Sequence, residues 1–227
     1  MTTSELLTTV AENIPSIHEA GKKEGIEEGK KAEYDAFWDT LQDYGNEQGR
    51  NYYYAFSYNL WDDTTFNPKY PIIGQANTST GCHSIFYANT LITDTKVPII
   101  VKARSLHSTF YRCKNLITIR EINVSPATIY AEGTFQECES LVNLKITGTI
   151  EQNNFNLCWS KKLSTESIVS VIEALSDEES LSGLSVTLSQ TAVDNMVFPF
   201  TSEKTGITYN SWSELESTRD KWTITLR

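Results

Sequence analysis

Four cysteines are the residues of this chain best suited to nucleophilic, redox or metal chemistry. Their positions lie 31, 25 and 20 residues apart, so that no two form a CxxC pair. Zinc sites and small disulfide frameworks use closer, paired spacing. We therefore predict reduced thiols that pack as small apolar groups. The four residues are Cys82, Cys113, Cys138 and Cys158.

Other pairings that could support catalysis have simpler interpretations. His107 precedes Cys113, but neither a helix terminus nor a resolving thiol marks that cysteine as a nucleophile. Glycan hydrolysis needs two carboxylates across a cleft. The acidic runs at 62–63 and 177–179 fit the charges of a turn and of a helix end instead. We predict no enzyme, no cofactor and no metal site.

The middle of the chain contains a repeat with phenylalanine as its anchor. The anchors recur at intervals of 24, 25 and 20 residues, at Phe86, Phe110, Phe135 and Phe155. A cysteine follows three residues later in the last three copies, and Asn89 takes that place in the first. Each copy continues with a leucine: Leu91, Leu116, Leu141 or Leu163. His83 and His107 share one phase of the repeat, which favours a structural role for both.

A unit this short cannot bury its own apolar face, so the copies must stack. We predict that each Phe-x-x-Cys piece is a tight helical turn and that the following apolar piece is a strand in a parallel ladder. Residues 82–163 would then form a short β-solenoid. Its predicted core contains Phe86, Phe110, Cys113, Leu116, Phe135, Cys138, Leu141, Phe155 and Cys158.

The N-terminal residues 1–45 have the pattern of a helix with one apolar seam. The seam consists of Leu7, Val10, Ile14 and Ile17, and it continues as Gly21, Gly25 and Gly29. Glycines cost a lone helix about 1 kcal/mol each but allow a second helix to approach closely. A helix up to residue 44 would be about 58 Å long, more than a small domain can cover. We predict an oligomerising stalk, trimeric or dimeric, with a single amphipathic helix packed on its own domain as the alternative.

Aromatic residues are concentrated between residues 34 and 70, mostly in a segment that we interpret as a β collar over 46–81. The aromatic residues at 52, 54, 56 and 58 alternate as in a strand, which would place Tyr53 on the opposite face. Such a cluster fits a core or a subunit interface. A ligand platform is the alternative, with Tyr53 and Trp61 as its candidate residues.

Residues 164–227 have the pattern of an α/β cap. Ser164 is suited to begin a helix, and Ser211 with Glu214 forms a capping-box pattern at a second helix extending to about Lys221. Alternating apolar residues predict strands over 184–189 and 222–226. The predicted fold class is therefore α+β: an N-terminal helical stalk, a leucine-rich-repeat-like β-solenoid and an α/β cap that closes the stack.

The net charge of −10 limits the partners of the chain. It excludes a general nucleic-acid binder and argues against an anionic membrane surface. No apolar run approaches the roughly 18 residues of a membrane span, so we predict no membrane insertion. The charge is −7 over 1–70, +3 over 71–163 and −6 over 164–227. The first seven residues lack the basic and apolar stretches of a secretion signal, which predicts a protein that is not exported by that route.

The pattern Phe-x-x-Cys-x-x-Leu-x-x-Ile/Leu, clearest over 106–163, resembles the BspA-like leucine-rich repeat family. Members of that family usually have a proline after the strand and Ile-Gly before the next phenylalanine, which Ser125-Pro126 and Ile129-Tyr130 match in one repeat only. The family consists mostly of surface adhesins and binding modules. The resemblance therefore implies a binding or scaffold role and names no ligand.

The leader from Lys31 to Tyr70 and the ending at Trp222 are similar to predicted tail and baseplate proteins of phages and prophages of Gram-positive gut bacteria. This resemblance implies a virion structural protein, assembled in the host cytoplasm, that attaches to other virion proteins or to a host receptor. The alternative is a bacterial cell-surface adhesin or host-interaction module.

Overall fold

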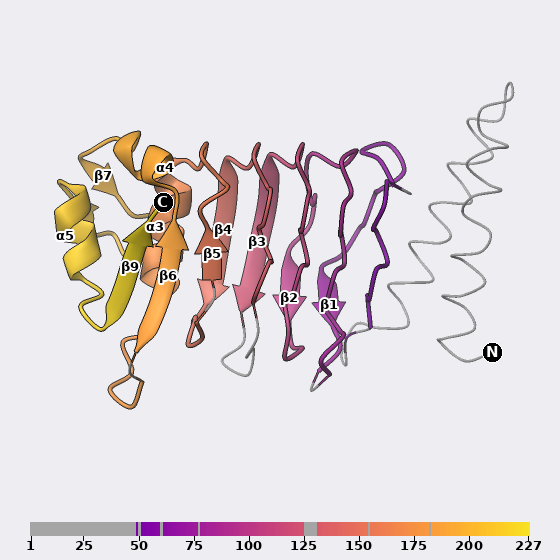
Figure 1. Ribbon diagram of the computed structural model, residues 1–227, viewed down its shortest axis with the longest axis horizontal. Helices are drawn as coiled ribbons and strands as arrows, with labels where there is room; N and C mark the ends of the chain where they lie inside the picture. Colours follow the sequence, from indigo (N-terminus) through magenta and orange to yellow (C-terminus); the bar gives the residue numbers. More distant parts are fainter. Residues whose placement is uncertain are drawn as a thin grey trace, which may run out of the picture.

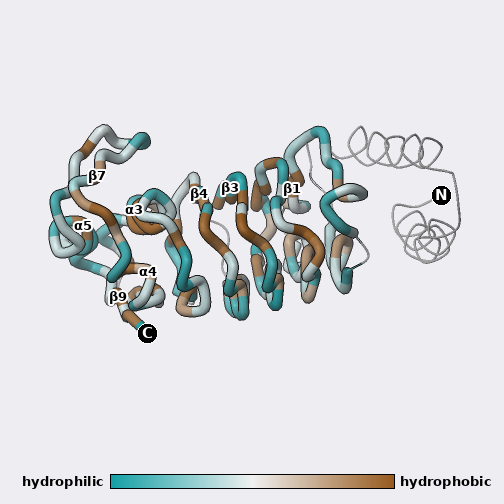
Figure 2. The backbone as a smooth tube through the Cα atoms, turned by 90° about the horizontal axis from the view of Figure 1, so that it is seen from above, coloured by the Kyte–Doolittle hydropathy of each residue, from teal (hydrophilic) through white to brown (hydrophobic). Residues whose placement is uncertain are grey.

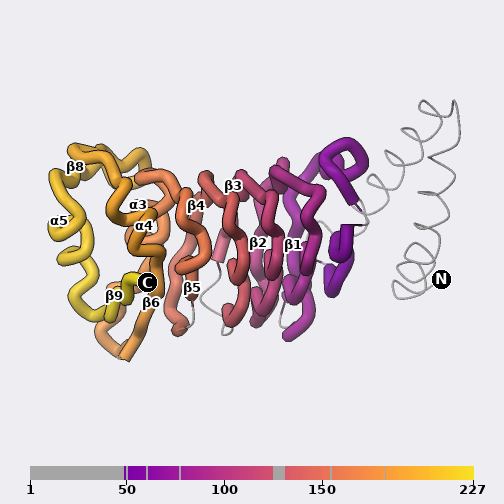
Figure 3. The backbone as a smooth tube through the Cα atoms, turned by 45° about the horizontal axis from the view of Figure 1, so that its top comes forward, coloured from indigo at the N-terminus to yellow at the C-terminus, as the bar shows by residue number. Residues whose placement is uncertain are grey.

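The chain folds into a β-solenoid of about four coils. The computed structural model describes residues 49, 51–59, 61–76, 78–124, 131–153, 155–181 and 183–227. The coils follow one another in chain order, and the first described coil and helix α5 lie at opposite ends of the stack (Figures 1 and 3). The predicted stalk and its seam, from Leu7 to Gly29, lie outside the described residues.

One side of the solenoid is a parallel four-stranded sheet in the order β1-β2-β3-β4. The strands are β1 (Ile72–Gly74), β2 (Ile99–Val101), β3 (Thr118–Val124) and β4 (Asn143–Gly148). Their alternate residues point into the core, and hydrophobic segments mark β3 and β4 in Figure 2. The predicted parallel ladder is confirmed. It also includes β1, which lies within the segment interpreted as a collar.

The other side of the solenoid, which we call the turn side, is a ladder of turns at 52–59, 82–89, 106–113 and 131–138. Phe56 N–H donates to the carbonyl of Ile85 at 2.8 Å, and Phe110 N–H donates to that of Thr134 at 3.0 Å. The N–H groups of the intervening residues instead form turn hydrogen bonds within their own coil. Cys113 N–H, for example, donates to the carbonyl of Phe110 at 3.0 Å. Every second backbone N–H therefore links neighbouring coils.

Residues with a left-handed backbone accompany this alternation. Ser108 has φ +53° and Arg112 has φ +61°, two residues before and two residues after Phe110. Each is the third residue of a hydrogen-bonded four-residue turn, the position that needs a positive φ in type II turns. The prediction of a helical turn is thus wrong. So is the prediction of a strand over 52–58, because Tyr54 and Tyr58 have φ +56° and +54°.

Phenylalanine rings form a continuous stack through the core, and all of them are buried. Neighbouring ring centroids are 5.3–5.9 Å apart along the stack. The rings of Phe86, Phe110 and Phe135 are nearly parallel, with interplanar angles of 7° and 11°. Such pairs add about 0.5–1.5 kcal/mol each beyond area burial. The stack consists of Phe56, Phe86, Phe110, Phe135 and Phe155.

A column of donors runs beside the phenylalanine stack. The thiol of Cys113 donates to the carbonyl of Phe86 at 3.0 Å, and that of Cys138 donates to Phe110 at 3.0 Å. In the first copy the amide of Asn89 reaches the carbonyl of Phe56 at 2.9 Å. A small buried donor three residues after phenylalanine therefore binds the preceding coil. This contact explains why asparagine can take the place of cysteine at that position.

The leucine position is regular in two copies and shifted in the first. Leu116 and Leu141 are buried as predicted. Leu91 is exposed, and Ile92 fills the core position in its place. Cys82 lies outside the donor column, four residues before Phe86, and its buried thiol occupies the space that a Cβ at Gly74 would need.

The fourth copy of the motif adopts a different structure. Phe155–Leu157 is strand β5, which starts a parallel sheet with β6 (Leu184–Leu188) and β9 (Trp222–Leu226) in the order β5-β6-β9. Cys158 is only partly buried, and the hydroxyl of Ser160 donates to the carbonyl of Cys138 at 3.3 Å. Ser160 thus also bonds to the preceding coil, but to the carbonyl of the cysteine rather than to that of the phenylalanine.

Helix α3 (Thr165–Ala174) covers the edge of β4 where a fifth strand would lie. The Ser167 hydroxyl accepts from Leu144 N–H at 2.8 Å and donates to the carbonyl of Val142 at 2.9 Å. Ser170 accepts from Ile146 N–H at 2.8 Å. Serine hydroxyls thereby satisfy backbone groups that another strand would otherwise pair.

The remaining elements are α4 (Gln190–Asp194), β7 (Phe200–Thr201), β8 (Thr208–Tyr209) and α5 (Trp212–Ser217). Ser164 and Ser211 are helix N-caps as predicted, although α5 ends at Ser217 rather than near Lys221. Sequence reasoning missed α4 and β7. The buried carboxylate of Glu173 anchors this part, because it accepts hydroxyl hydrogen bonds at 2.8–3.0 Å from Ser202, Thr205 and Tyr209.

Candidate functional site on the turn side

Tyrosine side chains form a contiguous aromatic surface on the turn side, which we call the aromatic row. The ring centroids of Tyr54 and Tyr58 are 5.8 Å apart, and each lies within 5.5 Å of the Tyr87 ring. Tyr87 in turn stacks on Tyr111 at 4.9 Å with an interplanar angle of 15°. The row consists of Tyr53, Tyr54, Tyr58, Tyr87 and Tyr111.

The backbone of each coil positions these rings. Tyr87 and Tyr111 directly follow the buried Phe86 and Phe110, and the alternating turns place them at the outer surface, half-buried. Because hydrogen bonds hold neighbouring coils in register, residues at the same position of the repeat lie next to each other in successive coils. The rings therefore stack on one another, which holds their orientation without any ligand.

The two residues proposed as a ligand platform have different environments. The Tyr53 side chain is 50% exposed at the end of the row, and Tyr58 in the same row is 58% exposed. Trp61 is 2% exposed and packs edge-on against Phe56, with ring centroids 5.7 Å apart. Trp61 is therefore a core residue rather than part of an exposed platform, because its flat side chain already contacts the phenylalanine stack.

Two histidines adjoin the aromatic row. The Nε2 atom of His83 lies 2.9 Å from the Nδ1 atom of His107, and Nδ1 of His83 lies 2.8 Å from the hydroxyl of Ser84. Tyr53 contacts the His83 ring at 5.1 Å between centroids. Desolvation and the neighbouring His107 lower the pKa of His83, which favours its neutral form. The shared repeat phase thus places the two partly buried rings side by side, with centroids 4.6 Å apart and planes tilted by 35°.

The cysteines do not combine with these histidines. Burial raises the pKa of the Cys82 thiol to about 12 and raises the pKa of Cys113 and Cys138 as well. The Cys113 thiol is bonded to a backbone carbonyl in the core, whereas His107 lies in the outer part of its coil. A protonated, buried thiol is a poor nucleophile.

Charged side chains border one end of the row. The Arg112 guanidinium lies 5.0 Å from the centroid of the Tyr111 ring and bonds to Glu137 at 3.1 Å. Lys114 contacts the same carboxylate at 3.5 Å. The hydrogen bond from Arg112 lowers the pKa of Glu137 despite the opposing effect of desolvation. An aromatic centre with a polar rim is the usual composition of a protein interface.

The acidic residues considered for hydrolysis form contacts within the chain. The Asp62 carboxylate accepts from the backbone N–H groups of Thr64 and Thr65, both at 2.9 Å. Desolvation raises its pKa, but these hydrogen bonds lower it more, so the net pKa is below the usual value. Asp63 accepts from Thr93 N–H at 2.9 Å, and Asp177 contacts Arg219 at 3.4 Å. These carboxylates bind the chain itself.

Two further properties concern only the part of the chain that the structure describes. Within it, no three histidine, cysteine or acidic side chains gather in a way that could hold a metal ion. Its helices, taken separately, are too short or too polar to cross a membrane.

Sequence reasoning found Tyr53 but missed Tyr54, Tyr58, Tyr87 and Tyr111. A signal for two of them was present, because Phe86-Tyr87 and Phe110-Tyr111 repeat the same dipeptide in phase. Comparisons of the chain with protein-family models, with curated proteins and with solved structures found no match.

Proposed function

We propose that this protein is a non-enzymatic attachment module, a structural component of a phage tail or baseplate. Its repeats, of the BspA-like leucine-rich type, would present the aromatic row to a neighbouring virion protein or to a host receptor. The proposal is supported by the sequence resemblance and by one structural observation, the contiguous row of stacked, partly exposed tyrosines.

The physical basis is the low cost of ordering such a surface. Tyrosine offers a large contact area with only two rotatable side-chain bonds, and binding sites are enriched in it for that reason. Rings that already stack on one another lose little further freedom when a partner covers them. Exposed aromatic patches of this kind are uncommon on proteins without a partner.

The proposal includes oligomerisation through residues 1–45. Several copies of one weak surface on a shared stalk would bind a repetitive target with much greater avidity than a single copy. Light scattering tests this part directly. A mass of 25.6 kDa for the full chain, which is that of a monomer, together with a monomer after residues 1–33 are removed, would contradict it.

The experiment for the binding role uses the fluorescently labelled full chain. It is incubated with a panel of Gram-positive gut bacteria and, separately, with the purified products of the genes that flank its own. We expect binding to at least one of these, reduced at least about tenfold by Tyr53→Ser combined with Tyr58→Ser, since interface aromatic residues often contribute 2 kcal/mol or more. Lys145→Ser, at an exposed position of β4 on the opposite sheet, is the matched control and should bind normally.

Three outcomes would contradict the proposal. They are binding to none of the targets, binding that the tyrosine variant leaves intact, and release of soluble sugar from the cells. The rival role, a bacterial adhesin or host-interaction module, would use the same aromatic row. It is favoured if the flanking genes encode export or anchoring functions rather than tail-tube, tape-measure or holin proteins.

A further inference from the structure

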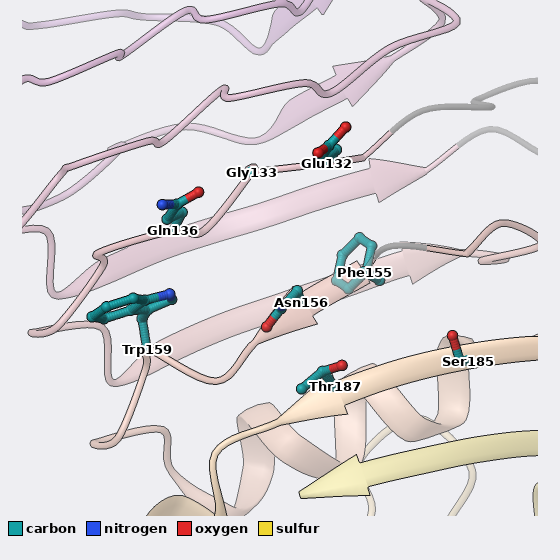
Figure 4. A pocket seen from close by; sticks show the side chains of 8 residues that line it. All are labelled: Glu132, Gly133, Gln136, Phe155, Asn156, Trp159, Ser185 and Thr187. Atoms are coloured by element: carbon teal, nitrogen blue, oxygen red, sulfur yellow. The ribbon is translucent and has the colours of Figure 1, made fainter. Parts of the chain in front are cut away.

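A polar pocket lies where the turn ladder meets the sheet β5-β6-β9. Its volume is about 290 Å³, close to the lower end of the roughly 300–1,000 Å³ typical of small-molecule sites. In Figure 4, Trp159 and Gln136 lie at one end, Glu132 and Ser185 at the other, and Asn156 and Thr187 between them. Nothing in the proposed attachment role uses this pocket.

The change from turns to strand creates the pocket. In β5, Phe155 and Leu157 point into the core, so Asn156 points outward. Its register partner in β6 is Thr187, and Ser185 lies on the same outer face two residues earlier. The floor of the pocket is therefore built from an amide and two hydroxyls.

The last turn coil forms the wall of the pocket. The hydrogen bonds between coils align Gln136 with Tyr111, and Tyr111 with Tyr87, in the two preceding coils. At this position of the repeat the last turn coil therefore has an amide where the earlier coils have an aromatic ring. Gly133 lies beside Tyr111, since a Cβ there would be 3.9 Å from the ring. The pocket thus adjoins the end of the aromatic row, but its chemistry is different.

The lining offers neutral hydrogen-bonding groups beside one exposed indole. Trp159 is 41% exposed. The carbonyl oxygen of the Asn156 side chain accepts from Cys158 N–H at 3.0 Å, which orients the amide so that its NH2 group serves as a donor. Among the lining residues only Glu132 has a charged side chain, and that charge is negative.

We propose that this pocket binds one neutral pyranose unit of a glycan. A pyranose ring presents C–H groups on one face, which suit the indole of Trp159, and hydroxyls around its edge, which suit Gln136, Asn156 and Thr187. The carboxylate of Glu132 disfavours an acidic sugar through like-charge repulsion. An open pocket of this size should bind a single sugar at millimolar concentration.

The test uses the full chain labelled with 5-fluorotryptophan and observed by ¹⁹F NMR. Trp159→Phe assigns the Trp159 resonance by its disappearance. The labelled chain is titrated with glucose, galactose, N-acetylglucosamine and glucuronate. We expect at least one neutral sugar to shift this resonance saturably while the resonances of buried Trp61 and Trp222 stay unchanged. Glucuronate should bind more weakly than glucose.

Variants separate this site from the aromatic row. Gln136→Ala and Asn156→Ala should each weaken the best sugar at least about fivefold, the usual loss for one hydrogen bond to a neutral ligand. Tyr58→Ser should leave sugar binding unchanged. Because the attachment experiment depends on Tyr53 and Tyr58 instead, either hypothesis can fail while the other stands.

Three results would overturn the saccharide assignment. One is the absence of any shift with neutral sugars at about 50 mM, far above a millimolar Kd. Another is a shift that persists in both amide variants. The third is a Trp159 resonance that responds to a protease-sensitive cell-envelope fraction but to no sugar, which would indicate a protein ligand.

Discussion

The same motif adopts two structures in this protein, and the difference between them determines where the binding surfaces lie. Around Phe110 and Cys113 the chain forms turns, with Tyr111 at the surface and the thiol in the core. Around Phe155 and Cys158 the chain forms strand β5, and the cysteine is partly exposed. The turn region presents aromatic rings, whereas the strand region presents amides and hydroxyls.

The residue two positions after phenylalanine accounts for the difference. In the turn copies this residue is Ala88, Arg112 or Glu137. Each of the three has a positive φ, and each is at least partly exposed to solvent. In the last copy it is Leu157, which is fully buried. Two apolar residues separated by one polar residue can both reach the core only in an extended strand. Spacing alone therefore does not define the local structure of a repeat.

The largest effect should come from the phenylalanine stack in the turn region. Phe110→Ala removes a ring that is stacked on both sides and leaves a cavity, so we expect it to destabilise the fold by about 3–5 kcal/mol. Urea unfolding measures this change. Tyr58→Ser, at a largely exposed ring of the same region, is the comparison and should cost only about 0.5–1.5 kcal/mol, because it loses ring contacts with Tyr54 and Tyr87 but leaves no cavity in the core. Equal effects of the two variants would mean that the stack is not the core of the turn region.

A second variant pair tests the position that separates the two regions. Leu157→Ala should destabilise the fold by about 2–5 kcal/mol, because it empties a fully buried site in β5. Arg112→Ala, at the equivalent turn position, removes a half-exposed side chain with its ion pair to Glu137 and its contact with the Tyr111 ring, and should cost about 1 kcal/mol or less. A larger loss for Arg112→Ala than for Leu157→Ala would contradict our explanation of the switch.

A third variant pair uses Cys113 and Cys158, which occupy the same position of the motif in the two regions. Cys113→Ala removes a buried group and its hydrogen bond to Phe86, so a loss of about 1–2 kcal/mol is expected. Cys158→Ala should cost less than about 0.5 kcal/mol, because that side chain is outside the donor column. Alkylation rates provide an independent measurement. Cys158 should react with iodoacetamide well before Cys113, whose pKa is raised by burial.

The smallest expected effect concerns pH and His83. Its pKa in the folded protein is lowered from 6.5 by desolvation and by His107, so the unfolded chain binds a proton more readily. Stability is therefore retained above the unfolded pKa and falls as the pH decreases through the folded pKa. The urea midpoint should be lower at about pH 5.5 than at about pH 7.5, and His83→Gln should reduce that difference. An unchanged difference in the variant would exclude His83 as its source.

Much of the fold follows from the sequence, since the repeat, the parallel ladder and most of the C-terminal elements were predicted from periodicity and capping residues. The turn geometry was not predictable from residue type, because Tyr54, Ser108 and Arg112 have no intrinsic preference for a positive φ. The hydrogen bonds between coils impose it. Trp61 illustrates the same limit for the site: its type suits a platform, but the neighbouring Phe56 places it in the core.

The polar pocket could not be predicted for a related reason. Its lining comes from the turn coil around Gly133, the strand around Asn156 and the strand around Thr187, which only the register between coils brings together. Periodicity identifies which residues of each segment face outward. It does not show that an amide follows two tyrosines in one column, because that alignment depends on turn hydrogen bonds rather than on sequence spacing.

Hydroxyl-radical footprinting of the chain, free and bound to its target, tests the central claim that the turn side is the binding surface. We predict that Tyr53 and Tyr58 become protected on binding, whereas Ile117, an exposed residue next to β3, keeps its reactivity. Protection of Ile117 together with unchanged reactivity of Tyr53 and Tyr58 would contradict the claim and assign binding to the other side of the solenoid.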